Sequence, residues 1–383
     1  MAEKRVYLAN FAEFGMYFSC PFYHSLMRRK IQRKALFAKK GSVNRGLKSW
    51  LIMLLTFLGL IYGAIFLIPA VPSKSNGEDR PVYKVKINPR SSLSGIAEQL
   101  KEQGISISSF VFQLSARCLF VGSKLKPGTY LLPTSASLGN ILLQIARGDR
   151  VRESLAIIPG VTIWQLRSLM DSHAAIIHQT KGMTNKELLQ SLNLNYPSDE
   201  GIFLPDTYVF DPDEPDLNIY RKATQSMQKQ LIQIWEKRED GLPLKTPYEL
   251  LILASIIEKE TGRLSDRDMV SAVFVNRLNK GMPLQTDPTV IYGIGPKFNG
   301  NLRKADLRRD TAYNTYMHKG LPPTPIAMPS KESILAAAHP AKSNALFFVA
   351  KGDGSSHFSQ SLKEHELAVD RYQRKIAPKS SDK

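Results

Sequence analysis

The sequence predicts an α+β protein with a single N-terminal transmembrane helix, a small module and a larger mixed α/β domain. Three observations carry this prediction: an uncharged segment from Trp50 to Ala70, a strand-helix-helix-strand order after residue 82, and mixed α/β patterning beyond residue 155. The length of 383 residues exceeds one compact domain, and 43% hydrophobic with 22% charged residues is typical of a folded chain. The predicted segments are a basic tail (1–48), a transmembrane helix (49–71), a linker (72–82), a small module (83–155), a larger domain (156–375) and a short tail (376–383).

The uncharged segment "WLIMLLTFLGLIYGAIFLIPA" has the length of a membrane-spanning helix. At 1.5 Å per residue it extends about 31 Å, which matches a bilayer core. A cleaved signal peptide, the alternative, has a shorter apolar region of about 7 to 15 residues. Residues 1–48 hold eleven Lys and Arg against two Glu, half of the net charge of +18. The positive-inside rule therefore puts the N-terminus in the cytoplasm and the body outside the inner membrane, in the periplasm.

Two further features belong to the N-terminal part of the chain. Residues 1–26 lack clear periodicity, whereas "MRRKIQRK" from Met27 is typical of the start of a basic cytoplasmic tail, so an upstream start-site artefact is one interpretation. Cys20 and Cys118 lie on opposite sides of the apolar segment, which leaves no intrachain disulfide framework. Stability must therefore come from packed cores.

The small module is indicated by "VYKVKINP" as a strand, "SSLSGIAEQLKEQG" and "SISSFVFQLSARCLFVG" as helices, "KPGTYLLP" as a strand and "SLGNILLQIARG" as a helix. This order suits a small α+β module. Together with the phrases "IAEQLKEQGI" and "PGTYLL", it resembles a LysM-like domain, a fold associated with the N-acetylglucosamine-containing glycans of cell walls. The alternative is a spacer that holds the larger domain away from the membrane.

Two glutamates end the apolar helix predicted over residues 247–261, in "YELLILASIIEKETG". With a step of 100° per residue, Glu258 lies at the edge of the apolar sector, and Glu260 lies about 160° away from Glu258 and points away from the centre of that sector. Burial would raise the pKa of Glu258, as a proton donor working near neutral pH requires. Geometry alone leaves the commoner alternative ahead, a helix-end carboxylate paired with a Lys or Arg.

Other chemistries find little support in the sequence. The seven histidines show no zinc-ligand spacing, and neither a Walker loop nor a G-x-S-x-G elbow occurs, so no metal or cofactor is expected. The chain beyond residue 48 carries a mild positive excess without a recognisable nucleic-acid fold. An anionic wall polymer is therefore a better partner than nucleic acid.

Seven phrases between residues 200 and 365 carry a family resemblance: "EGIFLPDTY", "ASIIEKET", "NRL", "LQTDPTVIYG", "AYNTY", "GLPPTPIAMP" and "AAAHPAK". In this order they closely resemble the MltG (YceG-like) family of membrane-anchored endolytic murein transglycosylases. The layout from Met27 onward fits the same family. The resemblance implies cleavage of the β-1,4 bond between N-acetylmuramic acid (MurNAc) and N-acetylglucosamine (GlcNAc) inside a nascent glycan strand, which leaves a 1,6-anhydro-MurNAc end.

The resemblance also implies roles for particular residues. Glu258 matches the catalytic acid, and Glu260 becomes a supporting charge. One carboxylate can suffice because the nucleophile is the C6 hydroxyl of the substrate, held close to C1, so no second carboxylate has to place a water. The substrate-binding residues implied are Gln285, Thr286, Asp287, Tyr313, Asn314, Thr315 and Glu200.

We further expect Glu258 on the floor of a deep groove, a largely buried helix over 247–261, and cell-wall synthesis machinery as a neighbour. Two alternatives stay open. A hydrolytic muramidase would use Glu258 with Asp287 or Glu200 as the second carboxylate. A non-catalytic peptidoglycan-binding scaffold would use the small module without turnover.

Overall fold

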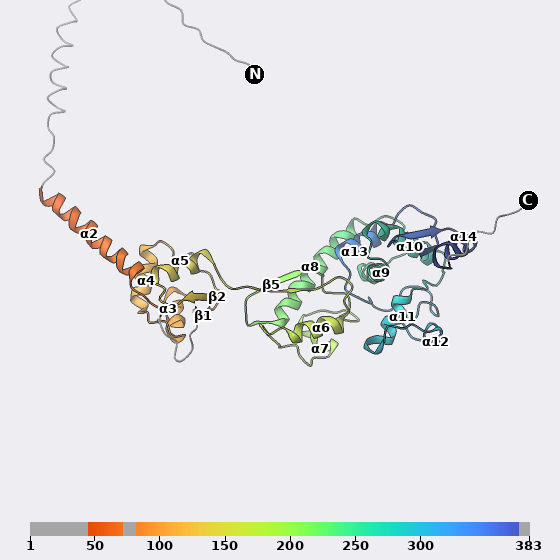
Figure 1. Ribbon diagram of the computed structural model, residues 1–383, viewed down its shortest axis with the longest axis horizontal. Helices are drawn as coiled ribbons and strands as arrows, with labels where there is room; N and C mark the ends of the chain where they lie inside the picture. The colour runs from red at the N-terminus through yellow and green to blue at the C-terminus, as the bar shows by residue number, and fades with distance from the viewer. Residues whose placement is uncertain (1–44, 72–81, 375–383) are drawn as a thin grey trace, which may run out of the picture.

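The computed structural model describes residues 45–71 and 82–374 (Figure 1). Most of the predicted basic tail, including the start-site question at residues 1–26, lies outside the described residues, as do residues 72–81 of the predicted linker and the tail at 376–383. In the described part, a long N-terminal helix leads into a small module, which is followed by the larger domain along the same long axis (Figure 1).

Helix α2 (Arg45–Leu67) contains the predicted membrane segment. Its residues Gly46–Leu67 form the one described helix that is long and apolar enough to cross a membrane. Only 6% of its most apolar window is buried in the protein, so its Leu, Ile and Phe side chains need another apolar environment. The predicted transmembrane helix is therefore present as a helix, although it ends at Leu67, before Pro69.

The small module follows the predicted order, with β1 (Val82–Ile87), α3 (Leu93–Glu102), α4 (Ser109–Cys118), β2 (Gly128–Pro133) and α5 (Leu138–Arg147). Strands β1 and β2 are antiparallel, from Val82 opposite Pro133 to Ile87 opposite Gly128. The Ser92 and Ser137 hydroxyls cap α3 and α5 by accepting bonds from the amides of Gly95 and Asn140. The predicted elements are confirmed, and the likeness to a LysM domain stays a prediction.

The end of the predicted membrane segment is part of the core of this module. Ala70 and Val71 are buried in the same apolar cluster as Val85, and their amides donate to the Ala136 carbonyl at 2.8 and 3.2 Å. The predicted linker therefore does not separate the membrane helix from the module, because the chain on both sides of it packs into one core.

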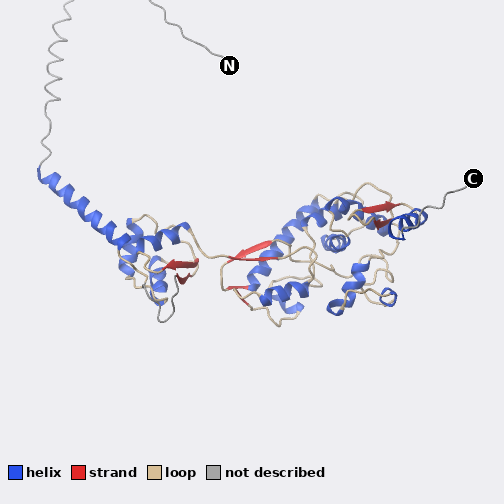
Figure 2. Cartoon of the chain, in the orientation of Figure 1, coloured by secondary structure: helices blue, strands red, loops and turns tan. Residues whose placement is uncertain are grey.

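The first part of the larger domain combines short strands with helices. Strand β3 (Glu153–Ala156) pairs antiparallel with β5 (Thr207–Phe210), and β4 (Ile176–Ile177) pairs parallel with β6 (Glu214–Pro215). The helices of this part are α6 (Ile163–Ser172), α7 (Asn185–Ser191) and the long α8 (Asp216–Glu236), and α8 packs against β5 and β6. Figure 2 shows that helix dominates over strand throughout the domain.

The second part of the domain carries the elements that form the site. They are α9 (Pro247–Glu260), the 3-10 turn η1 (Leu264–Asp266), α10 (Arg267–Asn279), α11 (Asp287–Ile294), the 3-10 turn η2 (Gly295–Lys297), α12 (Lys304–Leu307), α13 (Lys331–Ala338), the antiparallel pair β7 (Phe347–Ala350) and β8 (Ser356–Ser359), α14 (Leu362–Val369) and a π-helical turn η3 (Asp370–Arg374).

Helix α9 is the centre of this second part. The Thr246 hydroxyl accepts the Glu249 amide at the N-terminus and Pro247 occupies the first turn, a favourable start for a helix. The residues from Leu250 to Ile257 are all buried, and α9 packs against α8, α10 and α13. The expectation of a largely buried helix over 247–261 is confirmed.

The small module and the larger domain meet through two ion pairs. Lys84 lies 3.3 Å from Asp213, and Arg150 lies 3.1 Å from Asp211. Both pairs are partly exposed, where such pairs contribute about 0 to 1 kcal/mol each. They orient the two parts more than they stabilise them.

Candidate functional site

A pocket of about 370 Å³ opens between the C-terminal end of α9 and the elements α10, α11, β7 and α14. It combines aromatic rings with charged and hydrogen-bonding groups, as ligand pockets in proteins commonly do. Its lining residues are Glu260, Phe274, Arg277, Leu284, Gln285, Asp287, Tyr316, Phe347, Phe348, Leu362 and His365.

Glu260 is the last residue of α9 and the most enclosed acid of the pocket. The Thr286 hydroxyl donates a short hydrogen bond to its carboxylate. Burial raises the pKa of Glu260 from 4.5 to about 6, and the negative charge of Asp287 acts in the same direction, while the Thr286 hydrogen bond and Arg277 oppose the shift. A carboxyl with this pKa can both give and take a proton near neutral pH.

The segment Gln285–Asp287 forms one edge of the pocket. Gln285 has a positive φ of 52°, a strained backbone conformation for a residue with a side chain. Thr315 holds it there: its carbonyl accepts the Gln285 amide at 3.1 Å, and its hydroxyl accepts the Thr286 amide at 3.1 Å. Thr286 and Thr315 therefore fix the segment, while Gln285 and Asp287 face the pocket.

Tyr316 and Arg277 complete the polar wall. The Tyr316 hydroxyl donates to Asp287 at 2.6 Å. The Arg277 guanidinium donates to the Leu346 carbonyl at 2.7 Å and the Leu284 carbonyl at 2.8 Å, and its centre lies 5.1 Å from the Phe347 ring. Burial lowers the pKa of Arg277, whose charge is balanced by these carbonyl dipoles rather than by a direct ion pair.

His365 reaches the pocket from α14. Its ring stacks on Phe347 with 5.2 Å between centroids, and its Nδ1 is buried without a hydrogen-bond partner. Burial, with Arg277 nearby, lowers the pKa of His365, so the imidazole is neutral at physiological pH.

Glu258 is directed to another place. Arg267 at the start of α10 donates to its Oε1 at 3.1 Å, and the Ser330 amide and hydroxyl at the start of α13 donate to its Oε2 at 2.9 and 2.5 Å. The side chains of Glu258 and Arg267 are 5% and 8% exposed. Glu258 thus joins α9 to α10 and α13 through a buried ion pair.

The two glutamates therefore lie in different surroundings from those that the helical wheel indicates, and the catalytic role of Glu258 stays a prediction. Glu260, expected to be a supporting charge directed away from the apolar sector, lines the pocket, whereas the pocket lining does not include Glu258. The physical reason is that a helical wheel counts only the neighbours within one helix. Glu260 is covered by the distant Thr286 segment, which the wheel does not contain.

Two other predicted residues support the backbone outside the pocket lining. The Asn314 amide group donates to the carbonyls of Leu307 and Arg309 at 3.1 and 2.7 Å, which fixes the chain before Thr315. The Tyr313 hydroxyl bonds to Thr324 at 2.8 Å, and its ring packs edge-on against Tyr292 at 4.8 Å.

Glu200 is fully buried at the N-terminus of α6, away from the pocket lining. Both of its oxygens accept the Ile163 amide, at 2.9 and 3.1 Å. Burial raises the pKa of Glu200 to about 8, against the lowering effect of this amide and of the Tyr292 hydroxyl. A group held this way links the "EGIFLPDTY" turn to α6, and its raised pKa favours the uncharged form at neutral pH.

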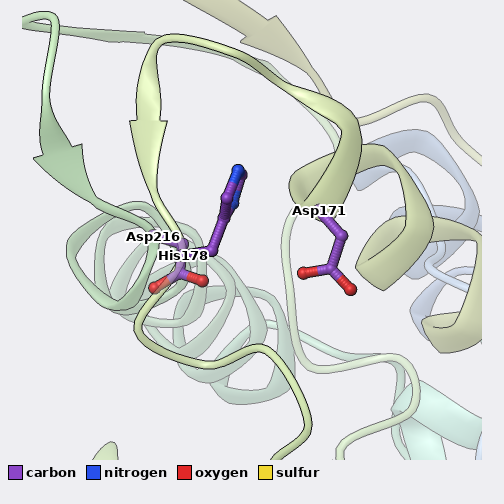
Figure 3. A group of neighbouring side chains, drawn as sticks. All are labelled: Asp171, His178 and Asp216. Atoms are coloured by element: carbon purple, nitrogen blue, oxygen red, sulfur yellow. The ribbon is translucent and has the colours of Figure 1, made fainter.

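Asp171, His178 and Asp216 form a three-residue cluster with the ligand types of a metal site, and their ligand atoms lie within 4.8 Å of one another (Figure 3). They come from α6, the segment after β4 and the start of α8. The Asp216 carboxylate already accepts the amides of Gln179 and Thr180 and the Thr180 hydroxyl, the last at 2.6 Å. These bonds tie the segment after β4 to α8, so the geometry fits a structural role better than a metal centre.

Sequence reasoning missed Arg277, Tyr316 and His365 as parts of the site. Arg277 lies in "NRL" and Tyr316 closes "AYNTY", so two of the recognised phrases contain a pocket residue that was not singled out. His365 had no local signal, because only the packing of α14 on β7 brings it to the pocket.

Comparisons with known proteins identify a family, related transglycosylases and a solved structure. The model of the YceG-like family matches residues 85–371. An endolytic murein transglycosylase of Bacillus subtilis is 31% identical over 337 residues, which cover 82% of this chain and 89% of that protein. One of Streptococcus pneumoniae serotype 2 is 25% identical over 364 residues, covering 84% of this chain and 65% of the relative. The crystal structure of a yceG-like protein of Listeria monocytogenes is 27% identical, with a TM-score of 0.45, over 75% of this chain and 98% of the other.

The family match extends from β1 of the small module through α14, so it includes every residue of the pocket. The matching stretch covers well over half of the sequence and agrees with the ordered phrases between residues 200 and 365. The chain therefore belongs to the YceG-like family, in which the similar proteins of B. subtilis and S. pneumoniae are endolytic murein transglycosylases.

Proposed function

We propose that this protein is a membrane-anchored endolytic lytic transglycosylase of peptidoglycan, with Glu260 as its acid and base. It cleaves the MurNAc-β-1,4-GlcNAc bond inside nascent glycan strands and leaves 1,6-anhydro-MurNAc ends, which terminates strand elongation. The observation that carries the proposal is the position of Glu260, an enclosed carboxyl in a polar and aromatic pocket.

The chemistry needs one group that changes its protonation state twice. Protonated Glu260 gives its proton to the glycosidic oxygen, the C1–O4 bond breaks, and positive charge develops at C1 and the ring oxygen. The C6 hydroxyl of the same MurNAc then attacks C1, and its proton returns to the Glu260 carboxylate. The GlcNAc leaves with a free C4 hydroxyl, and the enzyme regains its starting state without any water being consumed.

The pocket supplies groups for the intermediate. Asp287, an exposed carboxylate oriented by Tyr316, can stabilise the positive charge at C1. Gln285 and the neutral His365 offer hydrogen bonds to the acetamido groups and hydroxyls of the sugar, while Phe347 and Phe348 offer apolar faces for sugar rings.

Glu260 and Glu258 differ in what their oxygens already do. Both oxygens of Glu258 accept bonds from Arg267 and Ser330, which hold it as a buried carboxylate beside a guanidinium. Glu260 faces a cavity with space for substrate. The prediction from the resemblance that Glu258 is the acid is tested directly by changing each glutamate in turn.

The test uses the full-length protein in detergent with uncrosslinked glycan, and mass spectrometry of the products. Glu260→Gln is expected to abolish release of anhydro-ended fragments, while Glu258→Gln keeps turnover in the fraction that is folded, as measured by thermal denaturation. If Glu260→Gln keeps the activity of the native protein, the proposed role of Glu260 is wrong.

A hydrolytic muramidase is the second candidate, favoured by one observation: Asp287 lines the same pocket as Glu260 and could place a water. The chemical form of the product ends distinguishes hydrolysis from transglycosylation. Reducing MurNAc ends in place of the anhydro form would establish hydrolysis. If the native protein releases no fragments at all but retains glycan in a pull-down, the scaffold alternative is correct.

The anchor and its orientation are part of the proposal. Helix α2 has the length and composition of a single membrane span, and the basic residues before it favour a cytoplasmic N-terminus. The pocket then lies in the periplasm, close to newly made glycan and to the synthesis machinery. Protease protection of inverted and right-side-out membrane vesicles checks this orientation.

A further inference from the structure

The outward face of α4 in the small module is apolar, and much of it is exposed in the described protein. Val111 and Leu114 lie on this face, Phe110 beside them is 73% exposed, and Phe120 just after the helix is 85% exposed. The opposite face is buried in the module through Phe112 and Ala116. A helix that is apolar on both sides needs an apolar environment on both.

Helix α4 lies beside the end of the candidate membrane helix α2 (Figure 1). Val111 and Leu114 share an apolar cavity of about 340 Å³ with Ile61, Ala64 and Ile65 of α2. Ile61 is six residues before the end of α2 at Leu67, which at 1.5 Å per residue is about 9 Å along the helix. If α2 spans the bilayer, Val111 and Leu114 lie at the depth of lipid acyl chains.

Close contacts between α2 and the small module fix the position of α4 relative to α2. Pro69 bridges to Ser137, and the ring of Phe66 packs so closely on Gly139 of α5 that a Cβ there would lie 2.6 Å from it. Together with the amides of Ala70 and Val71 on the Ala136 carbonyl, these contacts leave no free segment between α2 and the module.

We propose that the α4 face (Phe110, Val111, Leu114 and Phe120) inserts into the membrane leaflet from which α2 emerges, so that the small module is a second membrane contact. The composition of α4 fits this occupant: it has no acidic residue, and its one charged residue, Arg117, stands in the last turn, where it can meet lipid phosphates. The continuity of the face with the lipid-exposed side of α2 favours lipid over a protein partner. The inference rests on the membrane anchor in the proposed function and is independent of its chemistry.

The test is electron paramagnetic resonance on the full chain in lipid nanodiscs, with single nitroxide labels in a Cys20→Ser/Cys118→Ser background. Collision with oxygen reports lipid, and collision with a water-soluble nickel complex reports water. The label on Leu114→Cys is expected to show an oxygen-to-nickel ratio several-fold higher than a label on Glu98→Cys, an exposed position on α3 of the same module.

A label on Leu58→Cys, in the middle of α2, tests the membrane anchor separately from the insertion of the α4 face. If that label is accessible to nickel, the anchor itself fails. If it is in lipid while the label on Leu114→Cys is accessible to nickel, the α4 face is solvated and the inference is overturned. Protection of Leu114→Cys from both reagents would indicate a second copy of the chain on the face, which also overturns the inference.

Discussion

At the scale of single residues, the site depends on two glutamates of one helix that do different work. Glu258 and Glu260 are separated by one residue, yet their carboxylates meet different partners because α10 and α13 approach one side of the helix end and the Thr286 segment approaches the other. The Glu258 carboxylate joins α9 to α10 and α13, whereas the Glu260 carboxylate faces the pocket, where we propose that it acts as the acid and base.

The pH dependence of activity follows from Glu260. In the proposed mechanism the reaction starts from protonated Glu260, so kcat/KM is expected to fall as pH rises through about 6, the raised pKa of this group. The measurement is initial rates on uncrosslinked glycan from pH 4.5 to 8.5. An activity that stays flat across this range would contradict the assignment.

The raised pKa of Glu260 also makes the stability of the folded protein depend on pH. Because folding raises the pKa of Glu260 from 4.5 to about 6, its stabilising contribution is fully present below pH 4.5 and is lost as pH rises through 6, about 2 kcal/mol in all. Glu260→Gln, which cannot ionise, is therefore expected to gain stability relative to the native protein between pH 5 and 7. Urea denaturation at several pH values measures the difference.

Replacement of Glu258 is expected to lower the stability of the protein, in contrast to replacement of Glu260. Removal of one partner of a buried ion pair leaves the other charge uncompensated, so Glu258→Ala is expected to destabilise the protein by about 3 kcal/mol. The double variant Glu258→Ala/Arg267→Ala should recover part of this loss, which a double-mutant cycle in urea reveals. Additive losses would show that the two groups are not coupled.

At the scale of elements, the tight turn at Gly201 sets how the "EGIFLPDTY" segment packs. Its φ is +80°, and a Cβ at this position would lie 2.4 Å from the Pro325 side chain. The turn therefore holds the buried Glu200 next to α6 only because no side chain intervenes.

Gly201→Ala is expected to cost more stability than the same change at Gly182, which has a φ of +81° and nothing within 4 Å of a built Cβ. Both variants carry the backbone cost of about 1 to 2 kcal/mol, and only Gly201→Ala adds the clash. The difference in thermal stability between the two variants measures the cost of the clash with Pro325. Equal losses in the two variants would mean that Pro325 moves aside freely.

The elements were largely predictable from sequence, and the site was predictable only in part. Alternation and helical spacing locate β1, α3 and α9 because these patterns are local. The family resemblance of the phrase around Gln285 and Asp287 indicated two residues that line the pocket. The pocket positions of Glu260 and His365 were not predictable, because their surroundings come from other elements of the chain and are not recorded in the residue pattern of one helix.

At the scale of the whole molecule, the chain contacts the module directly after α2, through Pro69, Ala70 and Val71, before the segment 72–81 begins. Insertion of ten Gly and Ser residues within 72–81 is therefore expected to leave the distance from the module to the bilayer unchanged, whereas the same insertion between Ile68 and Pro69 increases it. Fluorescence transfer from a dye on α3 to a lipid dye in nanodiscs measures both. Equal changes for the two insertions would mean that the Pro69–Ser137 contact does not hold in the membrane.

The close packing of Phe66 on Gly139 fixes the small module relative to α2, so a membrane that holds α2 would also hold the module in one position. A catalytic pocket on a flexible tether would sample glycan at many heights. If the larger domain also keeps a fixed position on the module, the pocket works in one layer of the wall, and its choice among chemically identical bonds depends on their distance from the bilayer. Strands are made at the bilayer, so newly made strands lie closest to it. The distance of a strand from the bilayer would then decide whether it is cut.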